Sequence, residues 1–139
     1  MIHWLYSANL KLYDVQGAMA AAATYWPMTS KVSPGDRLFL YLSAPEKRLA
    51  YDCRVTATGL REAEVIGAVR PFFRDRPKGG GRKKAFMRLQ AICRLPDAPD
   101  GPFCLAALKQ AGLTGMLMGP RKLDNTPGLL AHILEHLDD

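Results

Sequence analysis

The C-terminal segment carries three residues at a spacing that can bind a metal ion: His132, Glu135 and His136. The pattern His-x-x-Glu-His is that of one group of zinc metalloproteases, in which two histidines one helical turn apart hold the ion. Here the motif flanks the leucine face of an expected final helix, and no His- or Glu-rich segment offers a third ligand. The helix dipole alone also favours histidine near a helix C-terminus. We therefore expect no metal site and no cofactor.

The other groups that could carry catalysis do not form a recognisable pattern. The chain has no Gly-x-Ser-x-Gly motif, and the glycine run at residues 79–81 lacks the spacing and the Lys-Ser or Lys-Thr pair of a phosphate-binding loop. The three cysteines are widely spaced and are interpreted as buried thiols of a reduced compartment: Cys53, Cys93 and Cys104. We expect that the protein is not an enzyme.

The N-terminal sequence and the hydropathy pattern bear on location. The chain begins MIHWLYSANL, with no basic region and no cleavage pattern of a secretion signal. No apolar run approaches the roughly 20 residues that cross a bilayer. We expect a cytoplasmic protein that does not interact with membranes.

Positive charge is concentrated in one segment, from Arg70 to Lys84. The whole chain has a formal net charge of +6, and this segment holds seven basic residues and one acidic residue, so the remainder is balanced. A localised basic patch favours a polyanionic partner, because phosphate binding releases condensed counterions. The residues expected to contact a nucleic-acid backbone are Arg82, Lys83 and Lys84. The alternative is a flexible, solvated loop that aids solubility.

Aromatic residues gather where the expected elements begin and end. Trp4 and Tyr6 lie in an expected first strand, while Tyr25 and Trp26 end an expected first helix. Trp26 has little regular structure around it in this interpretation, so we expect it to face a ligand. Aromatic rings stack on a nucleobase with about 1–3 kcal/mol per base. The polar residues that could read the edge of a base are Ser7, Asn9 and Ser43.

Hydrophobic periodicity predicts the elements that position these residues. Strands are expected at residues 2–7, 37–43, 49–58, 63–69 and 86–95, and helices at residues 14–24, 103–111 and from Thr126 onward. The strand at 37–43 is apolar on both faces, which predicts a central position. One face of the next strand is expected to hold Leu49, Tyr51, Cys53, Val55 and Ala57. The residues of the strand at 86–95 that are expected to point inward are Met87, Leu89, Ala91, Cys93 and Leu95.

The order of these strands and helices predicts one α+β domain over residues 1–139. We expect a curved, mostly antiparallel sheet or small β-barrel flanked by helices. A flexible basic loop is expected at about residues 70–84.

Four segments in this order resemble the EVE domains of the PUA-like superfamily, which is related to YTH and ASCH domains. They are WLYSANLKLYD from Trp4, the pair Tyr25-Trp26, the stretch VSPGDRLFLYLSA followed by LAYDCRV, and Gly119 to Leu123 (GPRKL). The resemblance implies a flipped, modified base, either methylated adenine or a modified cytosine, held in an aromatic pocket. It assigns the cage tryptophan to Trp26, polar contacts to Ser7, Asn9 and Ser43, and a ring at the pocket lip to Tyr13. Tyr41 or Met118 would replace a second cage tryptophan, and Arg121 with the adjacent Lys122 would contact phosphate.

The resulting expectation is a non-catalytic module that binds DNA or RNA carrying a modified base. Such a module would act through an effector protein that is encoded separately. One alternative is a nucleotide or RNA-processing hydrolase of the ASCH type, for which Lys11 and Lys31 would be the candidate lysines. The other alternative is a protein-interaction domain.

Overall fold

The fold is built on one six-stranded sheet with the strand order β2-β5-β4-β3-β1-β6. The computed structural model describes residues 1–8, 10, 14–20, 23–28, 31–44, 46–72, 85–96, 101–114 and 120–137. The strands are β1 (His3–Ala8), β2 (Ala23–Pro27), β3 (Arg37–Leu42), β4 (Arg48–Arg61), β5 (Ala85–Arg94) and β6 (Arg121–Lys122). The helices are α1 (Val15–Met19), α2 (Glu62–Val69), α3 (Leu105–Ala111) and α4 (Pro127–Glu135), with 3₁₀ turns η1 (Arg70–Phe72) and η2 (Leu123–Asn125).

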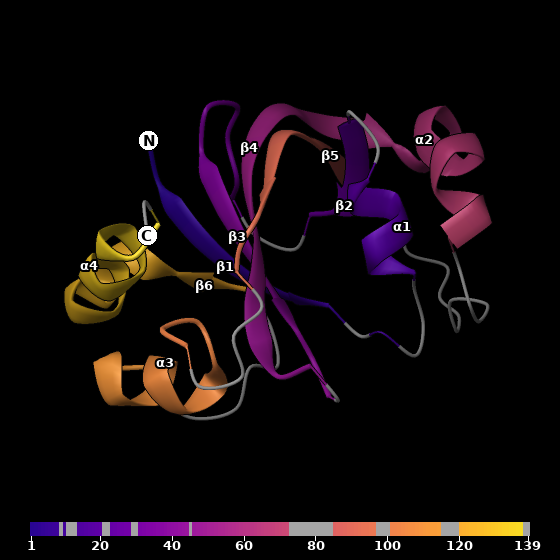
Figure 1. Ribbon diagram of the computed structural model, residues 1–139. Helices are drawn as coiled ribbons and strands as arrows, with labels where there is room; N and C mark the ends of the chain where they lie inside the picture. The colour runs from indigo at the N-terminus through magenta and orange to yellow at the C-terminus, as the bar shows by residue number, and fades with distance from the viewer. Residues whose placement is uncertain are drawn as a thin grey trace.

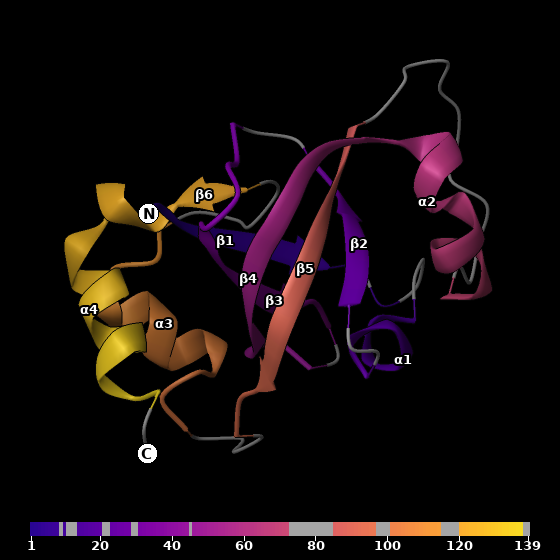
Figure 2. The same ribbon diagram turned by 90° about the horizontal axis from the view of Figure 1, so that it is seen from above.

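The helices cover both faces of this sheet. β1 pairs with β3 in parallel, and the other strand pairings are antiparallel. α1 and α2 lie on one side of the sheet, α3 and α4 on the other, and β4 bends over at its C-terminal end toward α2 (Figures 1 and 2). The expected α+β domain with a mostly antiparallel sheet is therefore confirmed.

Two hydrophobic cores result, one on each face of the sheet. The first core lies under α1 and includes Trp4, Tyr6, Leu38, Leu40, Tyr51, Cys53, Val55, Met87 and Leu89. The second core lies under α3 and α4 and includes Leu5, Phe39, Tyr41, Leu49, Leu108, Leu129 and Ile133. Alternate residues of a strand point to opposite faces, so β1 and β3 contribute to both cores. The prediction that residues 37–43 form a central strand buried on both faces is confirmed.

One residue of β4 breaks the expected alternation. Leu49 packs in the second core, whereas Ala50 and Tyr51 both belong to the first core. The register between β3 and β4 shifts between Leu40 and Tyr41, because β4 carries one extra residue at this point. The expectation that Leu49 and Tyr51 share a face is therefore wrong.

A second register shift changes the expected inward face of β5. Asp52 pairs with Cys93 and Arg54 pairs with Gln90. Between these two pairs β5 therefore contains one residue more than β4. Met87 and Leu89 are buried as expected, whereas Cys93 is exposed. The expectation of three buried cysteines holds only for Cys53.

Two expected elements have a different structure. The helix expected at residues 14–24 ends at Met19, and β2 then pairs with β5. Asp14 does cap α1, since its Oδ1 accepts a hydrogen bond from the Gly17 amide at 3.2 Å. Thr24 to Trp26 are β-branched or aromatic, and pairing with β5 outweighs the helical preference of the preceding alanines.

The segment expected as a strand at residues 63–69 is helix α2. Glu62 and Glu64 lie in its first turn, where negative charge is favoured by the helix dipole. The Glu64 carboxylate also accepts the Arg61 amide at 2.8 Å, which satisfies a backbone donor at the helix start.

The C-terminal helices follow the prediction. Gly112 ends α3 with φ 130°, a conformation that favours glycine. Pro127 occupies the first turn of α4 after Thr126, and the buried residues of the helix are Leu129 and Ile133. Among the described residues, no helix is long and apolar enough to cross a membrane. Most of the basic segment, residues 73–84, lies outside the described part of the chain.

Candidate functional site

Two tyrosines lie in one cross-strand row on the first-core face of the sheet. Tyr6 of β1 is opposite Leu40 of β3, Leu40 is opposite Tyr51 of β4, and Tyr51 is opposite Arg94 of β5. Directly paired residues share a face of the sheet. We call Tyr6, Leu40, Tyr51 and Arg94 the tyrosine row. It runs from buried phenols, 3% and 6% exposed, to an exposed guanidinium.

The Tyr6 hydroxyl has no hydrogen-bond partner among the described residues, although it is fully buried. A phenol can both donate and accept a hydrogen bond. A buried polar group left unpaired costs about 1–3 kcal/mol. The row therefore contains a buried hydroxyl whose hydrogen-bonding capacity is not used by the described residues.

Charged groups surround the second phenol of the row. Burial raises the pKa of Tyr51, the positive charges of Arg94 and Arg48 act in the opposite direction, and Asp14 adds to the rise. Arg48 lies opposite Leu42 at the start of β4, so it shares the first-core face. Its Nε donates to Glu46 Oε2 at 3.0 Å. Phenols and guanidinium groups thus meet at this end of the sheet, a combination suited to hydrogen-bonding and anionic groups.

Trp4 has a structural role on the same face. Its indole nitrogen donates to Asp36 Oδ2 at 3.0 Å, and Asp36 also accepts the backbone amides of Ile2 and Ser33 at 3.0 Å each. Burial raises the pKa of Asp36, but these three hydrogen bonds and the positive charge of the N-terminus outweigh it and leave the pKa below its usual value. Trp4 is therefore tied to the turn before β3.

Trp26 is half-buried on β2 and packs against the first core. It pairs with Met87 of β5, whose side chain belongs to that core. Trp26 thus shares a face with Tyr6 and Tyr51. Tyr25, the preceding residue, alternates to the other face.

The predicted pocket residues do not all lie on this face. Tyr41 packs in the second core, where burial raises its pKa, and Ser7 is directly opposite it in the register of β1 and β3. Ser7 and Tyr41 therefore face α3 and α4, and a single pocket cannot be lined by both of them and Trp26. Ser43 lies in the turn after β3, where its amide donates to the Ala8 carbonyl at 3.1 Å. It is thus at the same end of the sheet as the tyrosine row.

The predicted phosphate contacts are described only in part. Lys122 is exposed and pairs with Trp4, and Arg121 is half-buried and pairs with Leu5, so both lie on the edge strand β6. Lys31, the candidate lysine of the hydrolase alternative, is exposed. The predicted residues that lie outside the described part of the chain are Asn9, Lys11, Tyr13, Arg82, Lys83, Lys84 and Met118.

The sequence analysis missed Tyr51 and Arg94 as candidate site residues. The alternation of β4 places Tyr51 on a defined face, but which face meets Tyr6 depends on the strand order. Arg94 is not among the residues of the strand at 86–95 that were expected to point inward. The pairing of β4 with β5 brings it beside a tyrosine.

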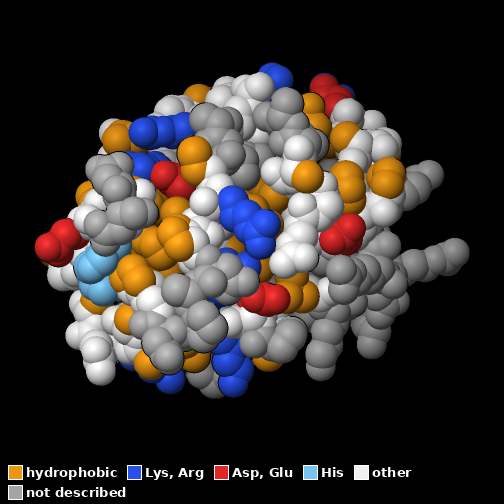
Figure 3. Space-filling view, viewed as in Figure 1, with side chains coloured by type: hydrophobic (Ala, Val, Ile, Leu, Met, Phe, Trp, Pro, Cys, Tyr) orange, Lys and Arg blue, Asp and Glu red, His pale blue; other side chains and the backbone are white. Residues whose placement is uncertain are grey.

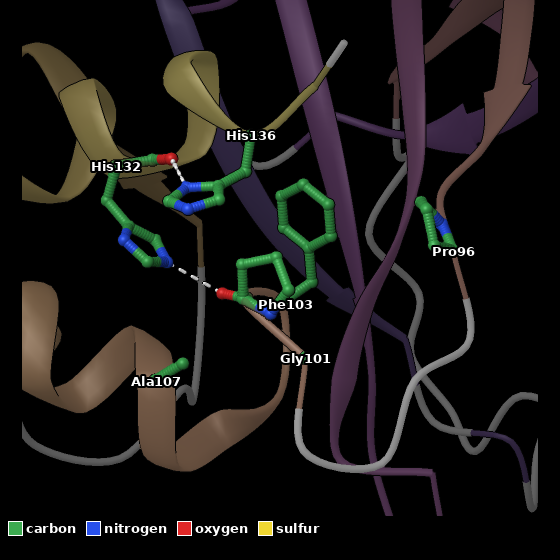
Figure 4. Close-up of a pocket in the computed structure, with 7 residues that line it drawn as sticks. Pro96, Gly101, Phe103, Ala107, His132 and His136 are labelled. Carbon is green, nitrogen blue, oxygen red and sulfur yellow. Dashed lines mark hydrogen bonds between the residues drawn. The ribbon is translucent and has the colours of Figure 1, made fainter. Parts of the chain in front are cut away.

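The histidines of the C-terminal motif contact backbone carbonyls. His132 Nε2 lies 2.7 Å from the Pro102 oxygen, and His136 Nδ1 lies 2.8 Å from the His132 oxygen (Figure 4). A carbonyl only accepts, so both of these nitrogens carry a proton and donate. In the described residues, no group of three His, Cys, Asp or Glu side chains is placed to hold a metal ion.

Comparison with known proteins gives information on the fold. No family model matches the chain, and no curated protein sequence matches it. Among solved structures, a variant of the ZmASCH protein of Zymomonas mobilis superposes with a TM-score of 0.68 at 10% identity, over 96% of both chains. The ASCH protein of Zymomonas mobilis itself gives 0.59 at 12% identity, over 93% of this chain and 94% of that chain.

These likenesses extend over nearly the whole chain, although the sequences are very different. They show that this chain shares the fold of those ASCH structures. The specific resemblance to EVE domains stays a prediction. The chain has the fold of an ASCH domain.

Proposed function

We propose that this chain is a non-catalytic nucleic-acid-binding module that holds one modified base against the first-core face of its sheet. The observation that carries the proposal is the common face of Trp26 and the tyrosine row, with Arg94 exposed at the end of that row. The ASCH-like fold and the resemblance to EVE domains support the same class of ligand.

The chemistry of this face suits a nucleobase. The half-buried indole of Trp26 offers a ring on which a base can stack, which contributes about 1–3 kcal/mol. The buried Tyr6 hydroxyl, unpartnered among the described residues, offers a donor and an acceptor for the edge of the base. Ser43, at the same end of the sheet, is a second polar candidate. In this proposal Ser7 and Tyr41 leave the pocket, whereas Asn9, Tyr13 and Met118 remain candidates.

The positive charge of the chain suits the phosphate backbone of a nucleic acid that carries this base. Arg94 would contact the phosphate next to the bound base, and the basic segment with Arg82, Lys83 and Lys84 would follow the strand farther out. Arg121 and Lys122 at the β6 edge are further candidates. Each phosphate contact adds affinity without sequence preference, and this affinity weakens as salt rises.

The preference for a modified base follows from the cost of extracting it. Removing a base from a duplex costs a few kcal/mol, and least where pairing is already weak. Specificity at this face would come from its shape and from hydrogen bonds such as that of the Tyr6 hydroxyl. We propose that the chain only binds the modified base and catalyses no reaction. A separately encoded effector protein would carry out the step that follows binding.

The test is a comparison of modified and plain oligonucleotides. Fluorescence anisotropy would measure the affinity for single- and double-stranded DNA and RNA that carry N6-methyladenine, 5-methylcytosine or neither. We expect tighter binding to one modified strand, and we expect Trp26→Ala to weaken it on the order of tenfold. Tyr25→Ala is the matched control, because it removes the neighbouring ring from the opposite face of β2.

Three results would contradict different parts of the proposal. No binding to any strand at low salt refutes the nucleic-acid function. Equal binding to modified and plain strands refutes recognition of a modified base. A preference that survives in Trp26→Ala refutes the assignment of the site to this face.

A further inference from the structure

A pocket of about 530 Å³ lies on the opposite side of the sheet from the tyrosine row. It is formed between α3, α4 and the segment that leads into α3, and His132, His136, Phe103, Ala107 and Pro96 surround it (Figure 4). Its volume is within the range of about 300–1,000 Å³ that is usual for small-molecule sites. The space-filling view shows histidine side chains at the surface near α4, next to hydrophobic side chains (Figure 3).

The walls of this pocket are largely apolar and well anchored. Phe103 is 2% exposed and belongs to the second core. Its carbonyl accepts the Leu49 amide at 2.9 Å, which ties the segment before α3 to β4. Proline and phenylalanine rings and the Ala107 methyl group present flat apolar surface. Such walls select a planar, apolar ligand body.

The two histidines supply the polar part of the pocket. His132 Nε2 donates to the Pro102 carbonyl and His136 Nδ1 donates to the His132 carbonyl, so these contacts fix the tautomer of each neutral ring. The ring centroids lie 4.6 Å apart with a 45° tilt. In the neutral ring, His136 Nε2 keeps its lone pair, and it has no hydrogen-bond partner among the described residues. The pocket therefore offers a hydrogen-bond acceptor.

The residues that line the pocket also limit the ligand class. The described lining residues include no Lys, Arg, Asp or Glu, so these residues offer no opposite charge to a phosphate or an ammonium group. His136 Nε2 and His132 Nδ1 are the two nitrogens left with a lone pair, and in the described part of the chain no third His, Cys, Asp or Glu joins them to hold a metal ion. An uncharged donor on an aromatic ring satisfies both the apolar walls and the acceptor.

We propose that this pocket is a second ligand site, which takes a phenol group with its hydroxyl donated to His136 Nε2. The phenol comes either from a free small molecule or from a tyrosine side chain of a peptide, because both present the same ring and donor. The site is separate from the first-core face, so it does not depend on the proposed nucleic-acid function.

The experiment is an NMR titration of the labelled full chain with phenol and with toluene, which differs only by a methyl group in place of the hydroxyl. We expect both compounds to shift the resonances of Phe103, Ala107 and His136 in a saturable way. His136→Phe should weaken phenol roughly three- to tenfold and leave toluene unchanged, because it removes one hydrogen bond. Glu135→Gln, an exposed neighbour on α4, is the matched control.

Further variants and ligands test the location of the site and the source of the phenol group. Ala107→Phe should fill the pocket and abolish the shifts from both compounds, while a thermal unfolding curve checks that the variant is folded. N-acetyl-tyrosinamide distinguishes the two sources, since it should bind like phenol if the pocket accepts a tyrosine side chain and should fail if only small molecules enter. No saturable shifts from phenol, shifts confined to the other face of the sheet, or an equal loss of phenol and toluene affinity in His136→Phe would overturn the proposal.

Discussion

Replacing Tyr6 with phenylalanine separates the stability of the fold from the binding of a base. Tyr6 is 3% exposed, and its hydroxyl is buried without a partner in the described part of the chain. An unpaired buried polar group costs about 1–3 kcal/mol, and phenylalanine fills the same space without that group. We therefore expect Tyr6→Phe to stabilise the free protein by about 1 kcal/mol.

Thermal unfolding measures the first half of this prediction. For a domain of this size, about 1 kcal/mol corresponds to a rise in Tm of roughly 3–5 °C. Tyr25→Phe is the matched control, because Tyr25 is only half-buried and lies on the other face of the sheet. Its Tm should stay within about 2 °C of the wild type, as expected for a change outside the core.

The binding assay measures the second half. If the Tyr6 hydroxyl reads the edge of the bound base, Tyr6→Phe should weaken the preferred oligonucleotide roughly three- to tenfold while it raises Tm. A fall in Tm would mean that the hydroxyl is already satisfied in the free protein. Unchanged affinity would mean that the base does not reach the tyrosine row. Either result refutes the reasoning from the unpartnered hydroxyl.

Two further predictions concern charge. Asp36→Asn should lower the free energy of unfolding by about 2 kcal/mol at pH 7, because an amide cannot accept from all three donors that the carboxylate now satisfies. The folded pKa of Asp36 is lowered, so the stability that the carboxylate contributes is complete above its unfolded pKa and is lost as the pH falls through the folded pKa. Denaturant curves should therefore show the variant and the wild type converging as the pH becomes more acidic. Replacing Arg82, Lys83 and Lys84 with alanine should weaken binding to all strands and reduce the slope of affinity against salt, as anisotropy titrations would show. An unchanged slope would assign those three residues to solubility alone.

The sequence predicted the fold best where the hydrophobic periodicity and the tertiary structure agree. The strand at residues 2–7, the doubly buried strand at 37–43 and the apolar face of α4 are confirmed because each pattern is long and its partners are apolar. The prediction of a helix through residue 24 was wrong because local alanine preference was outweighed by pairing with β5, more than 60 positions away. No local pattern contains that partner.

The candidate site was harder to predict, because it depends on which face each aromatic residue occupies. Tyr41 and Tyr51 lie ten positions apart on adjacent strands, and both look equally suited to a pocket. Only the register decides between them. Trp26 was expected after a helix, in irregular structure, yet it lies in a strand whose pairing with Met87 sets the direction of its side chain.

The irregularity in β4 explains how a cation reaches the tyrosine row. With regular pairing from Leu40 and Tyr51, Leu42 would lie opposite Leu49, and Arg48 would fall on the face of α3 and α4. The extra residue at position 50 shifts the pairing, so Leu49 lies opposite Tyr41 and Arg48 lies opposite Leu42. Leu49 then completes the second core, and Arg48 joins Tyr51 on the first-core face, where its charge acts on the phenol. One inserted residue therefore serves packing on one side of the sheet and places positive charge beside the candidate site on the other.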